Sequence, residues 1–73
     1  MTKKLFVEFY LSAMMKAATA GRVTRLTYNY TYTPPMADME TVAVLFDNGS
    51  MVPVNVADAG LLEIARSVLG VLK

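Results

Sequence analysis

Apolar and polar residues recur with a helical period at the start of the chain. At about 100° per residue, Lys3–Ala20 forms a helix with an apolar arc on one side and a polar side opposite. The arc holds Phe6, Val7, Phe9, Tyr10, Ala13, Met14 and Ala17, and the polar side holds Lys4, Glu8, Ser12, Lys16 and Thr19. The pattern predicts one long helix that ends at Gly21 and turns this arc, with Met14, toward the core.

A second interpretation of the same residues stays open. Leu5 and Met15 fall on the polar side of that helix, and two lysines lie at the unfavourable end of its dipole. The apolar residues of Lys3–Leu11 also alternate with period two. A strand over Lys3–Leu11, followed by a short helix capped by Ser12, is therefore the alternative.

Three later segments alternate with the period of a strand. Arg22–Thr33 carries tyrosines on one face and threonines on the other, and Met39–Phe46 and Met51–Val56 are rich in valine. A three-residue turn, Asp47-Asn48-Gly49, pairs Val44 with Val52 and gathers the valines on one face. Pro53 lacks an N–H group and so places the third strand at an edge.

The last helix is predicted from an apolar stripe that follows Asp58, the predicted N-cap residue. Its stripe comprises Leu61, Ile64, Ala65, Val68, Leu69 and Leu72. The sequence thus predicts a single small α+β domain over residues 1–73, with the order α-β-β-β-α. We expect a three-stranded antiparallel meander with both helices packed on one face.

Composition restricts how so short a chain can be stabilised. The 73 residues are 55% hydrophobic and include no cysteine and no histidine. Chains of this size often rely on a disulfide, a metal or a partner subunit. The residue types for the first two are missing, so we expect self-association, with a dimer favoured.

The same inventory argues against catalysis. The usual general bases and nucleophiles, His and Cys, are absent, and no glycine-rich phosphate loop occurs. We therefore expect no enzyme activity, no cofactor and no metal site. No run of residues is long and apolar enough to span a membrane, and no secretory signal is recognisable, so we expect a cytoplasmic protein without a membrane partner.

Residues on the strands and on the Pro34-Pro35 loop are the candidates for binding another protein. The candidates are Thr27, Tyr28, Asn29, Tyr30, Thr31, Tyr32, Met36, Met39, Leu45, Met51 and Pro53. The first strand carries no lysine or proline over Thr27–Thr33, so its edge is either open to a second copy or covered by the first helix or the loop. Dimerisation through that strand or through the first helix follows as the expectation.

A nucleic-acid-binding regulator is the alternative function. Arg22 and Arg25 would neutralise phosphates, and bases would stack on Tyr28, Tyr30 and Tyr32. The net charge of +1 gives this alternative little electrostatic support.

The stretch from Thr41 to Leu72, a valine hairpin with an Asp-Asn-Gly turn before an Asp-capped helix, resembles a pattern of short accessory proteins of phages and mobile elements. It carries no diagnostic family motif. Because a small chain without a cofactor site acts by occupying a surface, we expect a non-enzymatic protein that binds a partner protein. Inhibition of that partner, in the manner of anti-CRISPR proteins, is the concrete form of this expectation.

Overall fold

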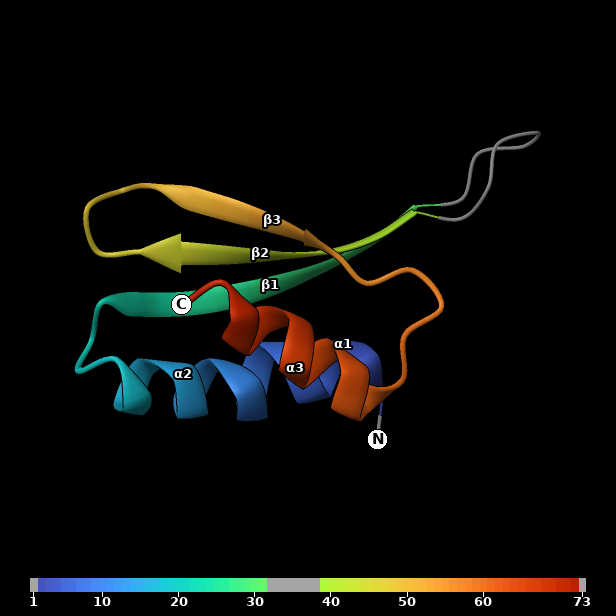
Figure 1. Ribbon diagram of the computed structural model, residues 1–73, viewed down its shortest axis with the longest axis horizontal. Helices are drawn as coiled ribbons and strands as arrows, with labels where there is room; N and C mark the ends of the chain where they lie inside the picture. The colour runs from blue at the N-terminus through green and yellow to red at the C-terminus, as the bar shows by residue number, and fades with distance from the viewer. Residues whose placement is uncertain (1, 32–38, 73) are drawn as a thin grey trace.

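The elements occur in the predicted order, and the α+β meander fold is confirmed. The computed structural model describes residues 2–31 and 39–72. Its elements are α1 (Lys3–Leu5), η1 (Phe6–Leu11), α2 (Ser12–Ala18), β1 (Val23–Thr31), β2 (Met39–Phe46), β3 (Met51–Asn55) and α3 (Leu61–Gly70). Both helical regions lie on the same side of the sheet (Figure 1). Of the predicted binding residues, Tyr32 and Met36 lie outside the described residues, as does the Pro34-Pro35 loop.

The segments α1, η1 and α2 run without a break and together form the N-terminal helix. The long helix is thus confirmed, and the alternative strand over Lys3–Leu11 is wrong. Thr2 caps the start, because its hydroxyl accepts a hydrogen bond from the Leu5 N–H at 3.1 Å. Ala20 and Gly21 reverse the chain with positive φ angles of 53° and 86°. The Gly21 N–H donates to the Lys16 carbonyl at 2.9 Å, which satisfies a terminal carbonyl as a helix C-cap does.

The sheet is antiparallel in the order β1-β2-β3, and the predicted register is confirmed. Val44 pairs with Val52. Gly49 has a φ of 86°, a left-handed conformation that glycine adopts without steric cost. Pro53 lies on the edge strand β3, where its missing N–H leaves no ladder bond unmade.

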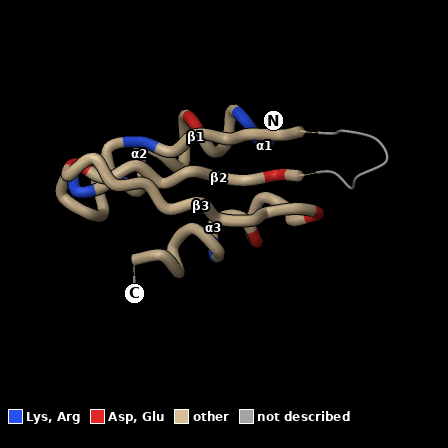
Figure 2. The backbone as a smooth tube through the Cα atoms, turned by 90° about the horizontal axis from the view of Figure 1, so that it is seen from above, with Lys and Arg blue, Asp and Glu red and all other residues tan. Residues whose placement is uncertain are grey.

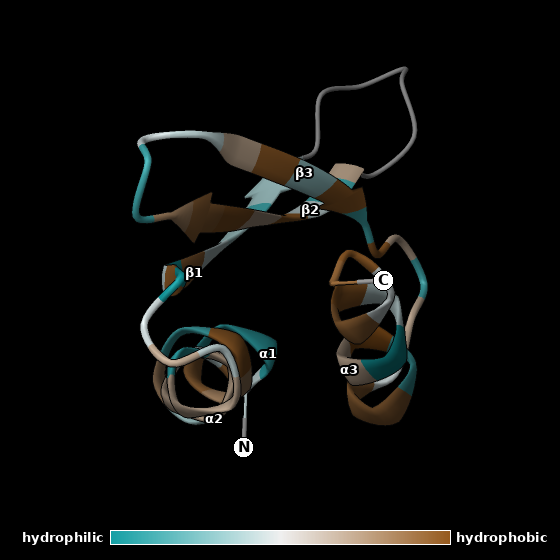
Figure 3. Cartoon of the chain, turned by 60° about the vertical axis from the view of Figure 1, so that its left-hand side comes forward, coloured by the Kyte–Doolittle hydropathy of each residue, from teal (hydrophilic) through white to brown (hydrophobic). Residues whose placement is uncertain are grey.

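The core lies between the sheet and the two helices (Figure 3). Its fully buried members come from η1, α2, β1, β2 and α3, along with Val56 just after β3. They are Val7, Leu11, Met15, Val23, Leu26, Val42, Val44, Val56, Ile64 and Val68.

The predicted orientation of the N-terminal helix is wrong for most of the arc, of which Val7 is buried and Phe6 half-buried. The buried apolar residues of the helix are Val7, Leu11 and Met15, whereas Phe9 is 65% exposed and Met14 58% exposed. The π-helical segment η1 has more residues per turn than an α-helix, so residues four apart stay nearly in line. The apolar arc was taken for the buried side because Ser12 and Thr19, which are buried on the same side as Val7, Leu11 and Met15, are polar.

The start of α3 also differs from the prediction. Gly60, not Asp58, is the N-cap residue. Asp58 lies in the preceding turn with a φ of 61°. The Glu63 carboxylate accepts a hydrogen bond from the Gly60 N–H at 3.4 Å. Within α3, Ile64 and Val68 are buried as expected, but Leu69 is exposed.

Candidate interaction surfaces

The face of the sheet away from the helices is covered by no element that the structure describes (Figures 1 and 3). Strand pairing places the side chains of alternate residues on this open sheet face. They are Arg25, Thr27, Asn29 and Thr31 of β1, Met39, Thr41, Ala43 and Leu45 of β2, and Met51, Pro53 and Asn55 of β3. Most of the predicted protein-binding residues are therefore gathered on one surface.

The apolar part of the open sheet face lies toward the Asp47–Ser50 turn. Arg25, Leu45 and Met51 are in register across the three strands, and Ala43 with Pro53 forms the next rung. Met51 is 56% exposed and Pro53 is also exposed. Arg25 is the one charged residue among the described side chains of this face, and all three strands show long uncharged stretches (Figure 2).

Tyr28 and Tyr30 are on the opposite face of the sheet. Tyr28 pairs with Val42, and Tyr30 with Glu40, on the side that the helices cover. Tyr28 is half-buried and packs against the core, whereas Tyr30 is exposed. The predicted binding residues thus split between two faces.

The buried carboxylate of Glu40 bonds to the side chains of Tyr28 and Lys3. The Tyr28 hydroxyl donates to Glu40 Oε2 at 2.5 Å, and Lys3 Nζ lies 3.0 Å from the same oxygen. These groups, the Tyr28 hydroxyl first and then Lys3, hold the pKa of Glu40 below its usual value of 4.5. Burial, and then the bond to Glu40, raises the pKa of Tyr28 to about 12. Because Lys3 begins the N-terminal helix, the cluster fastens that helix to the sheet.

The edge of β1 is covered by the N-terminal helix over Val23–Tyr28. The Leu26 N–H donates to the Ser12 hydroxyl at 2.8 Å, and the Tyr28 N–H to the Glu8 carboxylate at 2.8 Å. The Thr19 hydroxyl accepts from the Val23 N–H at 2.9 Å. Pairing of a second sheet along this part of β1 would break these bonds. Of the two possibilities that the sequence left open for Thr27–Thr33, the structure shows cover by the helix as far as Tyr28.

The outward side of the N-terminal helix is an apolar surface that the sequence assigned to the core. We define the helix face as Leu5, Phe9, Tyr10, Ala13, Met14 and Ala17, all exposed. None of these residues is charged. One signal for this orientation was present in the sequence, because Met15, which is buried, did not fit the predicted arc.

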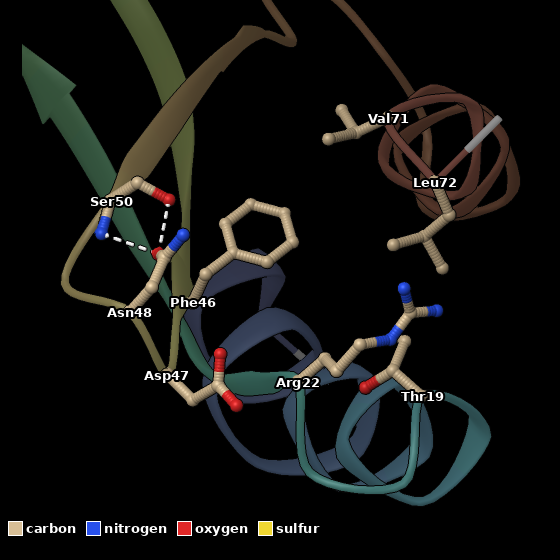
Figure 4. Close-up of a pocket in the computed structure, with 8 residues that line it drawn as sticks. All are labelled: Thr19, Arg22, Phe46, Asp47, Asn48, Ser50, Val71 and Leu72. Atoms are coloured by element: carbon tan, nitrogen blue, oxygen red, sulfur yellow. Dashed lines mark hydrogen bonds between the residues drawn. The ribbon is translucent and has the colours of Figure 1, made fainter.

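A pocket of about 360 Å³ lies between the Asp47–Ser50 turn and the end of α3 (Figure 4). Phe46, Val71 and Leu72 form its apolar wall, and Arg22 reaches across it toward Leu72. One cation and one anion, Arg22 and Asp47, line it. Their charges offset one another, so the pocket has no net charge to select an ionic small molecule.

The structure does not bring the predicted nucleic-acid residues together. Arg25 lies on the open sheet face, Arg22 lines the pocket, and Tyr28 and Tyr30 are on the helix-covered side. A strand of nucleic acid could not stack on the tyrosines while its phosphates met Arg25 on the opposite face.

Within the described residues, no group of three or more His, Cys, Asp and Glu side chains could hold a metal ion. No helix in this part of the chain is long and apolar enough to cross a membrane. Comparison with protein-family models, curated proteins and solved structures finds no match. Conclusions about function therefore depend on the surfaces described above.

Proposed function

We propose that the protein is a non-enzymatic, cytoplasmic interaction protein, a homodimer that binds a partner protein through its open sheet face. The observation that carries the proposal is the juxtaposition on that face of Leu45, Met51 and Pro53 with Arg25. Exposed apolar patches of this kind mark interaction sites. A structure that lacks the usual catalytic residue types acts by occupying a surface.

The composition of the open sheet face indicates the partner's chemistry. Met39 and Met51 are flexible and polarisable, so they adapt to an irregular apolar surface. Thr27, Asn29 and Thr31 add hydrogen-bonding groups beside them. Arg25 complements an acidic group. The expected partner surface is apolar and carries a carboxylate opposite Arg25.

Inhibition of a host or defence enzyme, in the manner of anti-CRISPR proteins, is the concrete form that we propose. The resemblance of Thr41–Leu72 to accessory proteins of phages and mobile elements supports it. A small rigid sheet can block a functional surface without any chemistry of its own.

Affinity capture from the protein's own host, with matched variants, tests the proposal. Met51→Asp puts a charge on the open sheet face, whereas Ser67→Asp puts one at an exposed position of α3. We expect the wild type and Ser67→Asp to retain the same partner and Met51→Asp to lose it by about tenfold or more. Equal retention by both variants, or no specific partner for the wild type, would overturn the proposal.

A further inference from the structure

The Asp47–Ser50 turn contains the one asparagine of the chain that a glycine follows. An asparagine in this position can modify itself, because the backbone nitrogen of the next residue can attack the side-chain carboxamide. Glycine has no side chain to obstruct the approach. Asn48 and Gly49 are both exposed, and no atom beyond the adjoining residues lies within 4 Å of the place that a Cβ of Gly49 would take. The approach is therefore sterically open.

Ser50 holds the carboxamide oxygen of Asn48 (Figure 4). Its N–H donates to Asn48 Oδ1 at 2.9 Å, and its hydroxyl donates to the same oxygen at 2.6 Å. Negative charge develops on this oxygen when a nucleophile adds to the carboxamide carbon, and donors aimed at such an oxygen stabilise the transition state. Among the described residues, none accepts a hydrogen bond from the amide nitrogen of Asn48, which is the leaving group. Asn48 thus combines activating donors with an unrestrained leaving group.

We propose that Asn48 is a site of self-modification, at which the folded chain, assisted by Ser50, loses ammonia and becomes aspartate or isoaspartate. The Gly49 nitrogen gives its proton to solvent and bonds to Asn48 Cγ. The Cγ–Nδ2 bond then breaks, and Nδ2 takes up a proton and leaves as ammonia. Water opens the resulting succinimide: its addition at Cγ gives aspartate, and its addition at the main-chain carbonyl carbon of residue 48 gives isoaspartate. Neither an oxidant nor a reductant is needed.

One hydrogen bond opposes the reaction. The Gly49 N–H donates to the Phe46 carbonyl at 3.1 Å, and it must be released before its nitrogen can react. The bond belongs to an exposed turn, and such segments open at the lowest free energy in a fold. The bonds from Ser50 to Asn48 span only two residues, so they can persist when the Phe46 bond opens. The rate should also rise with pH, because the reacting nitrogen must lose its proton.

The products change the pocket that the turn borders. Arg22 and Asp47 are the charged residues that line it, so a carboxylate at position 48 adds a second anion and gives the pocket a net negative charge. The net charge of the chain falls by one, from +1 to 0. The modified pocket therefore favours a cation, which the original one does not. None of these residues belongs to the open sheet face except through the chain, so a failure here leaves the proposed function intact.

Mass spectrometry of the folded full chain, incubated in mildly alkaline buffer, measures the reaction. Each event raises the mass by about 1 Da, and peptide mapping assigns it, because the chain has three asparagines and no glutamine. Asn29 and Asn55 are internal controls, since both are exposed but are followed by Tyr30 and Val56. We expect the product at position 48 while positions 29 and 55 stay intact. An unmodified Asn48, or equal modification of all three asparagines, would overturn the inference.

Variants of Ser50 test the part that the turn plays. Ser50→Ala removes the hydroxyl donor, so we expect the reaction at Asn48 to slow by about tenfold. Ser50→Thr keeps a hydroxyl and should react at the wild-type rate. Ser67→Ala, at an exposed position of α3, is the control for the loss of a serine hydroxyl and should also match the wild type. A rate in Ser50→Ala that equals or exceeds the wild-type rate would contradict the assistance by Ser50.

A comparison of the two products tests the effect on the turn. Asn48→Asp supplies the aspartate product directly, and its carboxylate can still accept the bonds from Ser50, so its urea midpoint should match that of the wild type. Isoaspartate adds one atom to the main chain between Phe46 and Ser50, which bond to one another across the turn. The aged chain that contains it, separated by anion exchange, should unfold at a lower urea concentration. Equal midpoints for both products would show that the turn is not altered.

Discussion

The two apolar rows of the N-terminal helix have opposite environments although they differ little in hydrophobicity. Val7, Leu11 and Met15 are buried, whereas Leu5 and Phe9, in the row on the other side, are exposed. The polar residues between the rows explain the difference. Their bonds to β1 determine which row points toward the sheet.

The magnitudes support this explanation. Burying one more ring such as Phe9 would gain about 1.5–3 kcal/mol. Turning the helix would leave the buried amides of Val23 and Leu26 without Thr19 and Ser12 as acceptors, and each buried amide without a partner costs about 1–3 kcal/mol. It would also break the exposed bond from the Tyr28 N–H to Glu8 and expose the row that is now buried. The observed orientation is therefore the more stable one.

The largest expected effect comes from the buried row. Leu11→Ala removes a fully buried side chain from the centre of the core, so the free energy of unfolding should fall by about 2–5 kcal/mol. Urea denaturation followed by circular dichroism measures it. A loss below about 0.5 kcal/mol, which is typical of surface positions, would contradict the burial of this row.

The next effect tests the polar residues of the N-terminal helix that bond to β1. Ser12→Ala leaves the Leu26 N–H without its acceptor, and we expect a loss of about 1–3 kcal/mol in the same assay. Ser67→Ala, at an exposed position of α3, is the control and should change stability little. Equal effects of the two variants would mean that the bonds to the β1 edge do not orient the helix.

A smaller effect concerns the attachment of the helix start to the sheet. Glu40→Gln removes the charge that Tyr28 and Lys3 stabilise, so we expect a loss of roughly 1–2 kcal/mol at neutral pH. The pKa of Glu40 is lowered in the folded state. Its contribution is therefore complete above the usual value of 4.5 and disappears as the pH falls through the lowered pKa.

Urea midpoints measured across this acidic range provide the check. Glu40→Gln should show a shallower fall in stability with acid than the wild type does. Tyr28 affects stability at alkaline pH. Because its pKa is raised in the folded state, its contribution to the free energy of unfolding is lost as the pH rises from 10.0 toward about 12. Parallel pH profiles for wild type and Glu40→Gln would show that the buried carboxylate does not contribute.

The smallest effect is expected on the exposed row. Phe9→Gln, measured at dilutions at which the chain is monomeric, should change the free energy of unfolding by less than about 0.5 kcal/mol. A loss of several kcal/mol in the monomer would place Phe9 in the core and contradict the structure.

Strand periodicity and turn chemistry were sufficient to predict the sheet. The valines of Met39–Phe46 and Met51–Val56 and the Asp47-Asn48-Gly49 turn determine the register that the structure shows. Both signals are local in the sequence. They also specify one register, because a shift by one residue would move the valines to the other face of the sheet.

The orientation of the N-terminal helix depends on contacts that the sequence pattern does not contain. The pattern shows neither the π-helical segment nor the pairing of Ser12 and Glu8 with amides far along the chain. The open sheet face was predicted in part, through Leu45, Met51 and Pro53. Most residues of the helix face had been assigned to the core, although the first helix was one of the two expected dimer surfaces.

Thiol labelling at two neighbouring positions tests the central claim most directly, because the natural chain has no cysteine. Ser12→Cys and Ala13→Cys are compared with a thiol reagent at dilutions at which the chain is monomeric. Our account predicts slow labelling at position 12, which is buried, and labelling close to the rate of a free thiol at position 13, which is exposed. Fast labelling at position 12 with protection at position 13 would contradict it.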